Sequence, residues 1–237
     1  MTRQRALVLA GLVGFLMLGV SAAVLGPALP EFRSRFHLNV AEGSWLLTVN
    51  SGGAVLGVLL GGWANYLRKP KPALIGGSLV VAAGACMLAF GHHWWLALTG
   101  SSLVGIGFGL LDFGVLVILA AAFAETGASV ITSLSAAFSV GAVIGPVLVS
   151  ASTHDVRPAF LTLAALALAL ALLWTRTPVE SPDREASAGV PAAGMAVGFA
   201  FLLALYVSLE VGVGSWETTY LRDANGFTAA DAARATS

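Results

Sequence analysis

The chain has 237 residues with no net charge, and 57% of them are hydrophobic while only 10% are charged. Soluble domains contain about 25% charged residues, so this composition excludes an ordinary soluble domain and predicts an all-α integral membrane protein. No basic tract is long enough to predict a nucleic-acid partner, and the single cysteine, Cys86, excludes a disulfide framework and a thiolate metal site.

The first apolar run covers residues 6–29 and follows Arg3 and Arg5. A membrane-spanning helix needs about 20 apolar residues, whereas the core of a signal peptide has about 7–15. We therefore predict a retained first transmembrane helix. We expect it to stop at Pro27 and Pro30, because a proline inside a helix removes a backbone hydrogen bond.

Further apolar runs of similar length follow along the chain. They predict transmembrane helices over residues 43–64, 72–91, 95–122, 128–151 and 158–175. The chain then divides into an N-terminal six-helix bundle at 1–175, a polar cytoplasmic linker at 176–191, a seventh transmembrane helix at 192–217, and an extracytoplasmic tail at 218–237 that leads toward an eighth helix.

The second predicted helix carries glycines at a spacing of four residues, Gly53, Gly57 and Gly61. Residues at this spacing share one face of a helix. Small residues on one face allow two helices in a bilayer to approach closely. The glycines therefore predict a close helix–helix contact.

A short basic hairpin follows this helix, with Arg68, Lys69 and Lys71 interrupted by Pro70 and Pro72. Cytoplasmic loops of membrane proteins are enriched in lysine and arginine. The hairpin therefore predicts a multi-pass protein of the cell (inner or plasma) membrane with a cytoplasmic N-terminus.

An internal repeat relates the two halves of the bundle. A shift of 88 residues places Ser51–Gly57 on Ser139–Gly145 without a gap, so that Gly53 coincides with Gly141 and Gly57 with Gly145. Three predicted helices separate the copies, and an odd number means that the second copy is inverted in the membrane. Inverted three-helix repeats are typical of secondary transporters, whose sites lie near the bilayer midplane.

Asp112 and Glu210 are the two acidic residues that lie most clearly inside predicted spans, and none of the spans contains Lys, Arg or His. Low dielectric without a cationic partner favours the neutral form of a carboxyl group. Each acid therefore either binds a proton, a cation or a polar solute, or serves packing as a hydrogen-bonded neutral acid. Asn50, also at mid-span, is a candidate for either solute contact or helix pairing.

The second predicted helix and the hairpin resemble the G-x-L-A-D-R-x-G-R-K loop of the major facilitator superfamily. Gly61 and Ala64 match, Arg68 and Lys69 keep the basic character, and Asn65 replaces the aspartate that latches this loop in the family. The resemblance implies a conformational role for this loop. It also implies a transporter of twelve spans in two six-helix halves, of which this chain holds one half and one helix.

Two further segments resemble the fucose-permease-like sugar transporters of that superfamily. The stretch Tyr206–Trp216 is similar to their pattern Y-x-G-x-E-x-x-x-G-x-W, with Ser208 in place of a glycine, and Gly105–Asp112 is similar to a glycine run that ends in an acid. Leu116 and Ser135 depart from the asparagine and histidine common there. Tyr206 and Trp216 are candidates to stack on a sugar ring, although a tryptophan here also suits the membrane interface.

One motif points to a different branch of the superfamily. Gly141, Gly145 and Pro146 resemble the core of a motif in drug/proton antiporters, but its flanking glycines are replaced here. We expect these three residues to serve helix packing and bending.

These patterns predict a secondary active transporter that moves a small, sugar-like polar solute by alternating access with proton coupling. They predict no enzyme activity, no cofactor and no metal. The alternatives are a drug/proton antiporter of the same superfamily and a truncated, non-transporting membrane subunit. The expected partners are the solute, a proton or cation, the lipid bilayer, and either a missing C-terminal half or a second copy.

Overall fold

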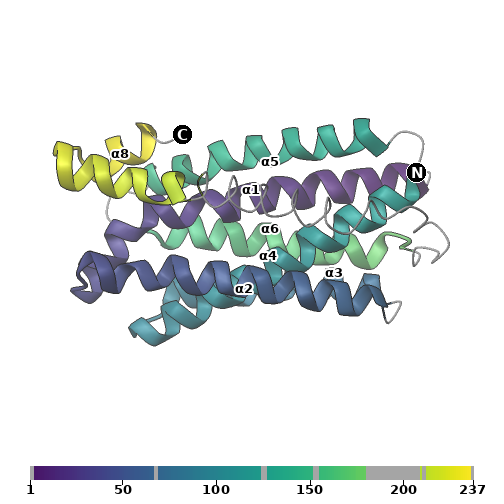
Figure 1. The fold of residues 1–237 in the computed structure, drawn as a ribbon, viewed down its shortest axis with the longest axis horizontal. Coiled ribbons are helices and arrows are strands. Elements are labelled where there is room, and N and C mark those ends of the chain that lie inside the picture. Colours follow the sequence, from purple (N-terminus) through teal and green to yellow (C-terminus); the bar gives the residue numbers. More distant parts are fainter. Residues whose placement is uncertain are drawn as a thin grey trace, which may run out of the picture.

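The computed structural model describes residues 3–66, 69–123, 127–151, 155–179, 209 and 212–235, and this part of the chain is all-α. Helices that are long and apolar enough to cross a membrane lie alongside one another in an elongated bundle (Figure 1). They are α1 (Arg3–Phe36), α2 (Val40–Tyr66), α3 (Pro70–Phe90), α4 (Trp94–Ala122), α5 (Gly127–Ser150) and α6 (Arg157–Arg176). The predicted six-helix membrane bundle is confirmed.

The predicted end of the first helix at Pro27 and Pro30 is wrong, because α1 continues through both prolines to Phe36. Both prolines are buried inside the helix. A proline removes one hydrogen bond, and transmembrane helices tolerate this where neighbouring helices surround the site. The helix ends at Phe36, the backbone of the following His37 has φ 54°, and the Leu38 N–H donates to the Arg33 carbonyl at 2.9 Å.

The start of α2 lies before the predicted residue 43 because a capping box fixes it. The Glu42 N–H donates to Asn39 Oδ1 at 2.8 Å, and the Asn39 N–H donates to Glu42 Oε2 at 2.8 Å. This reciprocal pair satisfies backbone donors that a helix N-terminus leaves without intrahelical partners. Residues Asn39 and Glu42 have the required spacing in the sequence.

Helix pairing in the bundle follows the internal repeat. The most extensive contacts of α2 are with α4, and those of α1 are with α5. The starts of α2 and α3, residues 40 and 70, recur at residues 127 and 157, the starts of α5 and α6. The repeat places α1 on α4 and α2 on α5, so the α2–α4 pair of helices corresponds to the α1–α5 pair.

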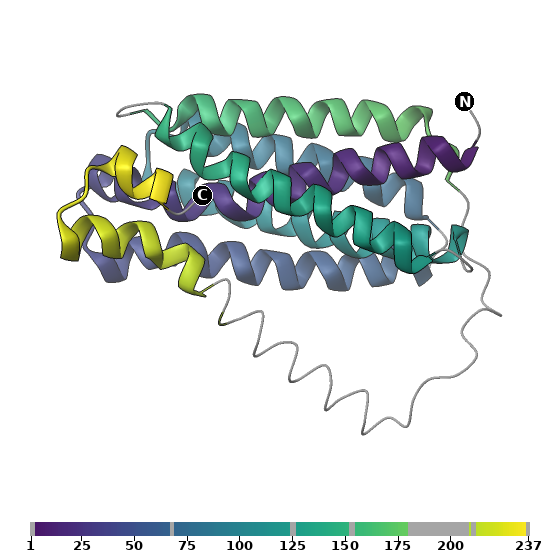
Figure 2. The same cartoon turned by 90° about the horizontal axis from the view of Figure 1, so that it is seen from above.

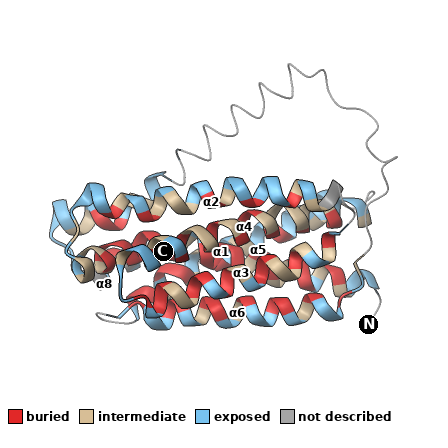
Figure 3. Cartoon of the chain, turned by 90° about the horizontal axis from the view of Figure 1, so that it is seen from below, coloured by how far each residue is buried: buried red, intermediate tan, exposed pale blue. Residues whose placement is uncertain are grey.

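The two helices α2 and α5 lie at the edges of the bundle. Only 22% of the apolar stretch of each is buried, compared with 61% for α1. Figure 3 shows the exposed surface that runs along α2, and the more buried α1, α3 and α6. The core therefore lies between α1, α3, α4 and α6, which also hold most of the buried residues.

Past the bundle, most of the predicted linker and seventh helix, residues 180–208, 210 and 211, lies outside the described residues. A helical segment runs over residues 212–225, and α8 (Ala229–Ala235) follows it. Both lie at the end of the bundle away from the N-terminus (Figures 1 and 2). There α8 packs against α5 and α1.

Candidate functional site

Asp112 lies on α4 between the faces that contact α2 and α1. A Cβ atom at Gly109 would meet the Ala54 carbonyl of α2, and a Cβ atom at Gly11 of α1 would lie 3.6 Å from Val115. Asp112 is three residues from both Gly109 and Val115, so helical spacing places it on the strip between the two contacts. The carboxyl group is half-buried and has no hydrogen-bond or ion-pair partner among the described residues.

Asn50 joins α2 to α4 through a pair of hydrogen bonds with Ser101. Asn50 Nδ2 donates to the Ser101 carbonyl at 2.9 Å, and Ser101 Oγ donates to the Leu46 carbonyl at 2.7 Å. Ser101 is fully buried, and Asn50 is half-buried. Of the two roles open to Asn50 in the sequence, this geometry favours helix pairing.

The glycine ladder of α2 lies against the backbone of α4. A Cβ atom at Gly53 would meet the Ser102 carbonyl, and one at Gly57 would meet the Ile106 carbonyl. In turn, Gly105 and Gly109 of α4 lie against the Asn50 and Ala54 carbonyls. Sequence reasoning did not assign these two α4 glycines to the contact, although their spacing of four residues is the same signal.

The corresponding glycines of α5 lie against α1. A Cβ atom at Gly141 would meet the Leu16 carbonyl, and one at Gly145 would lie 3.1 Å from the Ala23 side chain. Pro146 is buried inside α5. The glycines of the motif that resembles the antiporter pattern therefore serve the packing of α5 against α1.

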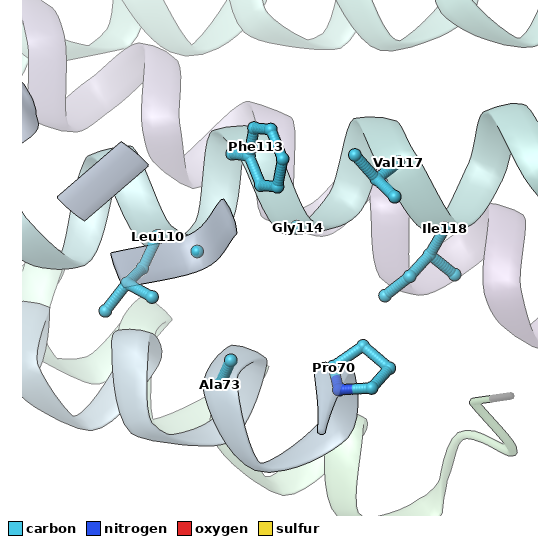
Figure 4. A pocket seen from close by; sticks show the side chains of 8 residues that line it. Pro70, Ala73, Leu110, Phe113, Gly114, Val117 and Ile118 are labelled. Carbon is cyan, nitrogen blue, oxygen red and sulfur yellow. The ribbon is translucent and has the colours of Figure 1, made fainter. Parts of the chain in front are cut away.

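The third glycine of the ladder, Gly61, lies against a side chain instead of a backbone. A Cβ atom there would be 3.1 Å from the Phe113 ring. Gly61 lines a small cavity whose other described lining residues come from α3 and α4 (Figure 4), namely Pro70, Ala73, Leu110, Phe113, Gly114, Val117 and Ile118. None of the described residues that line this cavity has a polar side chain to offer a solute.

The predicted conformational loop is only partly described. Lys69 is exposed directly before α3, and its N–H donates to the Ala64 carbonyl at 2.9 Å. Asn65 lies in the last turn of α2, while Arg68 lies outside the described residues. From the same hairpin, Lys71 Nζ donates to the Thr175 carbonyl at 2.9 Å and thereby ties the start of α3 to the end of α6.

Two of the candidate solute residues, Tyr206 and Glu210, lie outside the described residues. Trp216 is half-buried in segment 212–225 and packs against the hydrophobic core of the bundle. Of the candidate solute residues, the described helices therefore place Asp112 on α4 and Asn50 on α2, at its contact with α4. Within the described ranges, no cluster of three His, Cys, Asp or Glu side chains could hold a metal ion.

Comparison with known proteins gives relatives that carry sugars. The chain is 33% identical over 139 residues to the sodium-dependent glucose transporter 1 of Rattus norvegicus, which covers 56% of this chain and 28% of that protein. It is 25% identical over 104 residues to the arabinose-proton symporter of Escherichia coli K12, and this match covers 44% of this chain and 22% of that protein. The chain therefore spans only a minor part of the length of these relatives.

Solved structures of transporters share the fold. A bacterial homolog of the human lysosomal transporter Spinster, inward-facing and unoccupied, matches with a TM-score of 0.74 at 15% identity, over 99% of this chain and 59% of that one. The nucleoside transporter NupG matches with a TM-score of 0.74 at 15% identity, over 99% and 63%. The family model of the Major Facilitator Superfamily matches residues 11–233. The chain belongs to the Major Facilitator Superfamily, a family of transporters and not of enzymes.

Proposed function

We propose that this chain forms part of a secondary active transporter that moves a sugar-like solute by alternating access, with Asp112 as the group that binds the coupling proton. The observation that carries the proposal is the position of Asp112, a half-buried acid at mid-helix with no partner among the described residues. An ionisable side chain inside a membrane span is costly and usually faces a bundle interior or a wet cavity. A carboxyl group there can accept a proton and release it when the cavity opens.

The sugar-like nature of the solute is supported by the relatives. Their names specify glucose, inositol and arabinose as the transported solutes. We propose Tyr206, Glu210 and Trp216 as further solute contacts, since a sugar offers a CH face for stacking and hydroxyl groups for hydrogen bonds. The drug/proton antiporter alternative is less well supported, because the glycines on which it rests lie against α1.

Alternating access is supported by the internal repeat, which makes the α2–α4 and α1–α5 pairs of helices equivalent. A bundle built from two inverted repeats is the architecture that secondary transporters use to open at either side. Since the chain covers less than two thirds of the solved transporters, we propose that a second bundle closes the pathway. That bundle is either a C-terminal half or a second copy. We further propose that the protein lies in the cell membrane with a cytoplasmic N-terminus and a cytoplasmic linker at 176–191.

The test compares uptake and counterflow in proteoliposomes that carry the native protein or the Asp112→Asn variant. Labelled glucose, arabinose and inositol are the probes, each with and without an imposed pH gradient. Because asparagine mimics the protonated acid permanently, we expect gradient-driven accumulation to vanish while counterflow persists. Glu217→Gln, an equivalent change at an exposed acid of segment 212–225, is the control and retains both activities.

Two outcomes would contradict this assignment. Full gradient-driven accumulation in the Asp112→Asn variant would remove Asp112 from the mechanism. Accumulation that follows an imposed sodium gradient and ignores the pH gradient would replace the proton by a sodium ion as the coupling ion.

A further inference from the structure

An ion pair joins α1 to the helical segment 212–225 across 190 residues of sequence. Arg33, in the last turn of α1, donates from Nη1 to Asp223 Oδ2 at 2.8 Å. The Arg33 side chain is 18% exposed, and that of Asp223 is 43% exposed. The pair therefore lies at the edge of the protein, where solvent screens it only in part.

The α1–α2 corner holds Arg33 in position for this contact. A Cβ atom at Gly43, in the first turn of α2, would lie 2.8 Å from Arg33 Cγ, so the arginine stem crosses α2 where a side chain is missing. The Arg33 carbonyl accepts the Leu38 N–H that closes the end of α1. The guanidinium Nε is buried without a partner in the described part of the chain, so the Asp223 carboxylate supplies the ionic partner of this group.

A close backbone contact lies beside the ion pair. A Cβ atom at Gly26 of α1 would lie 3.0 Å from the Ser215 carbonyl. Ser215, Thr219 and Asp223 follow at a spacing of four residues and share one face of their helix. Thr219 is buried. The segment thus lies along the last turns of α1 at the end of the bundle away from the N-terminus (Figure 1).

We propose that Arg33 and Asp223 form a latch that closes this end of the solute pathway and separates when this end opens. The latch rests on the proposed alternating-access function. Segment 212–225 belongs to the part of the chain that follows the proposed linker, so a rocking motion between the two parts must change its contact with α1. An exposed ion pair changes the ratio of separated to closed molecules by roughly fivefold or less. A contact of this strength can separate in every transport cycle.

The test measures the distance between two nitroxide labels by EPR spectroscopy on the full chain in lipid nanodiscs. The labels are attached at Ala41→Cys in α2 and Ala224→Cys in segment 212–225, both exposed, with Cys86→Ser as background. In Arg33→Ala we expect the ratio of separated to closed molecules to rise by roughly fivefold. Arg35→Ala is the matched control, since its guanidinium lies over the Phe36 ring, 5.4 Å from the ring centroid, and it keeps the native distribution.

A charge exchange separates the ion pair from the packing of the arginine stem. The double variant Arg33→Asp/Asp223→Arg returns the ratio toward the native value, while Arg33→Asp alone does not. High salt raises the separated fraction of the native chain and leaves Arg33→Ala unchanged, because salt screens only the ion pair.

An unchanged distance distribution in Arg33→Ala overturns the latch, and so does a charge exchange that stays separated like the single variant. These distances are read without any solute. Absence of transport in proteoliposomes would therefore refute the proposed function and leave the distance result in place, whereas an unchanged distance refutes the latch and leaves the transport result in place.

Discussion

The contact between α2 and α4 predicts a sharp difference between two glycine-to-alanine substitutions. In Gly57→Ala the new methyl group would meet the Ile106 carbonyl of α4, whereas at Gly76 of α3 no atom of another described helix lies within 4 Å of the added carbon. The two variants add the same group to two transmembrane helices. They differ only in what that group meets.

The expected magnitude follows from two terms. Replacing glycine by alanine inside a helix stabilises it by roughly 0.5–1 kcal/mol, and this gain applies to both sites. Adding a methyl group to a tightly packed contact costs about 1–3 kcal/mol, and this cost applies to Gly57 alone. The free energies of unfolding of the two variants should therefore differ by about 1–3 kcal/mol, with Gly57→Ala the less stable.

The measurement is the thermal unfolding midpoint of both purified variants in the same detergent. For a chain of this size, 1 kcal/mol corresponds to about 2–4 °C. We expect Gly76→Ala to unfold at or above the native midpoint and Gly57→Ala at least about 2 °C below Gly76→Ala. Equal midpoints would show that α2 and α4 do not approach as closely as the structure places them, and would refute the role of the glycine ladder in packing.

Two further predictions concern the same bundle. Asn50→Ala removes a hydrogen bond to the Ser101 carbonyl and should lower the free energy of unfolding by about 1 kcal/mol, as is usual for interhelical hydrogen bonds in membranes. The check is thermal unfolding beside the control Thr48→Ala, whose hydroxyl donates to the Ser44 carbonyl of the same helix. An equal loss of stability in both variants would contradict the prediction. A cysteine at exposed Lys69 should react with a membrane-impermeant maleimide only in inside-out vesicles, because basic hairpins stay in the cytoplasm; reaction in intact cells would reverse the proposed topology.

Much of the bundle could be predicted because single helices leave strong signals in the sequence. Apolar length gave the bounds of α3 to α6 to within a few residues. The end of α1 was missed because proline was weighed as a helix breaker. Its cost is one hydrogen bond, and neighbouring helices that bury Pro27 and Pro30 can offset it.

The contacts between helices were harder to predict. The ladder of Gly53 and Gly57 indicated a close contact but not the partner helix, because spacing within one helix says nothing about which helix it faces. The pairing of Arg33 with Asp223 spans 190 residues and has no local pattern at all. Asp112 could be placed at mid-span from the sequence, whereas its position between the α2 and α1 contacts needed the neighbouring helices.

The exchanged pairing of the helices has a consequence for synthesis. During translation α1 and α2 enter the bilayer first, yet their most extensive contacts are with α5 and α4, which the ribosome has not yet made. The glycine faces of α1 and α2 must therefore wait among lipids until their partners arrive. Contacts between distant segments form slowly, so the first repeat depends on the second for its final structure. A nascent chain that is released before α5 would leave α1 without the helix that makes its most extensive contacts.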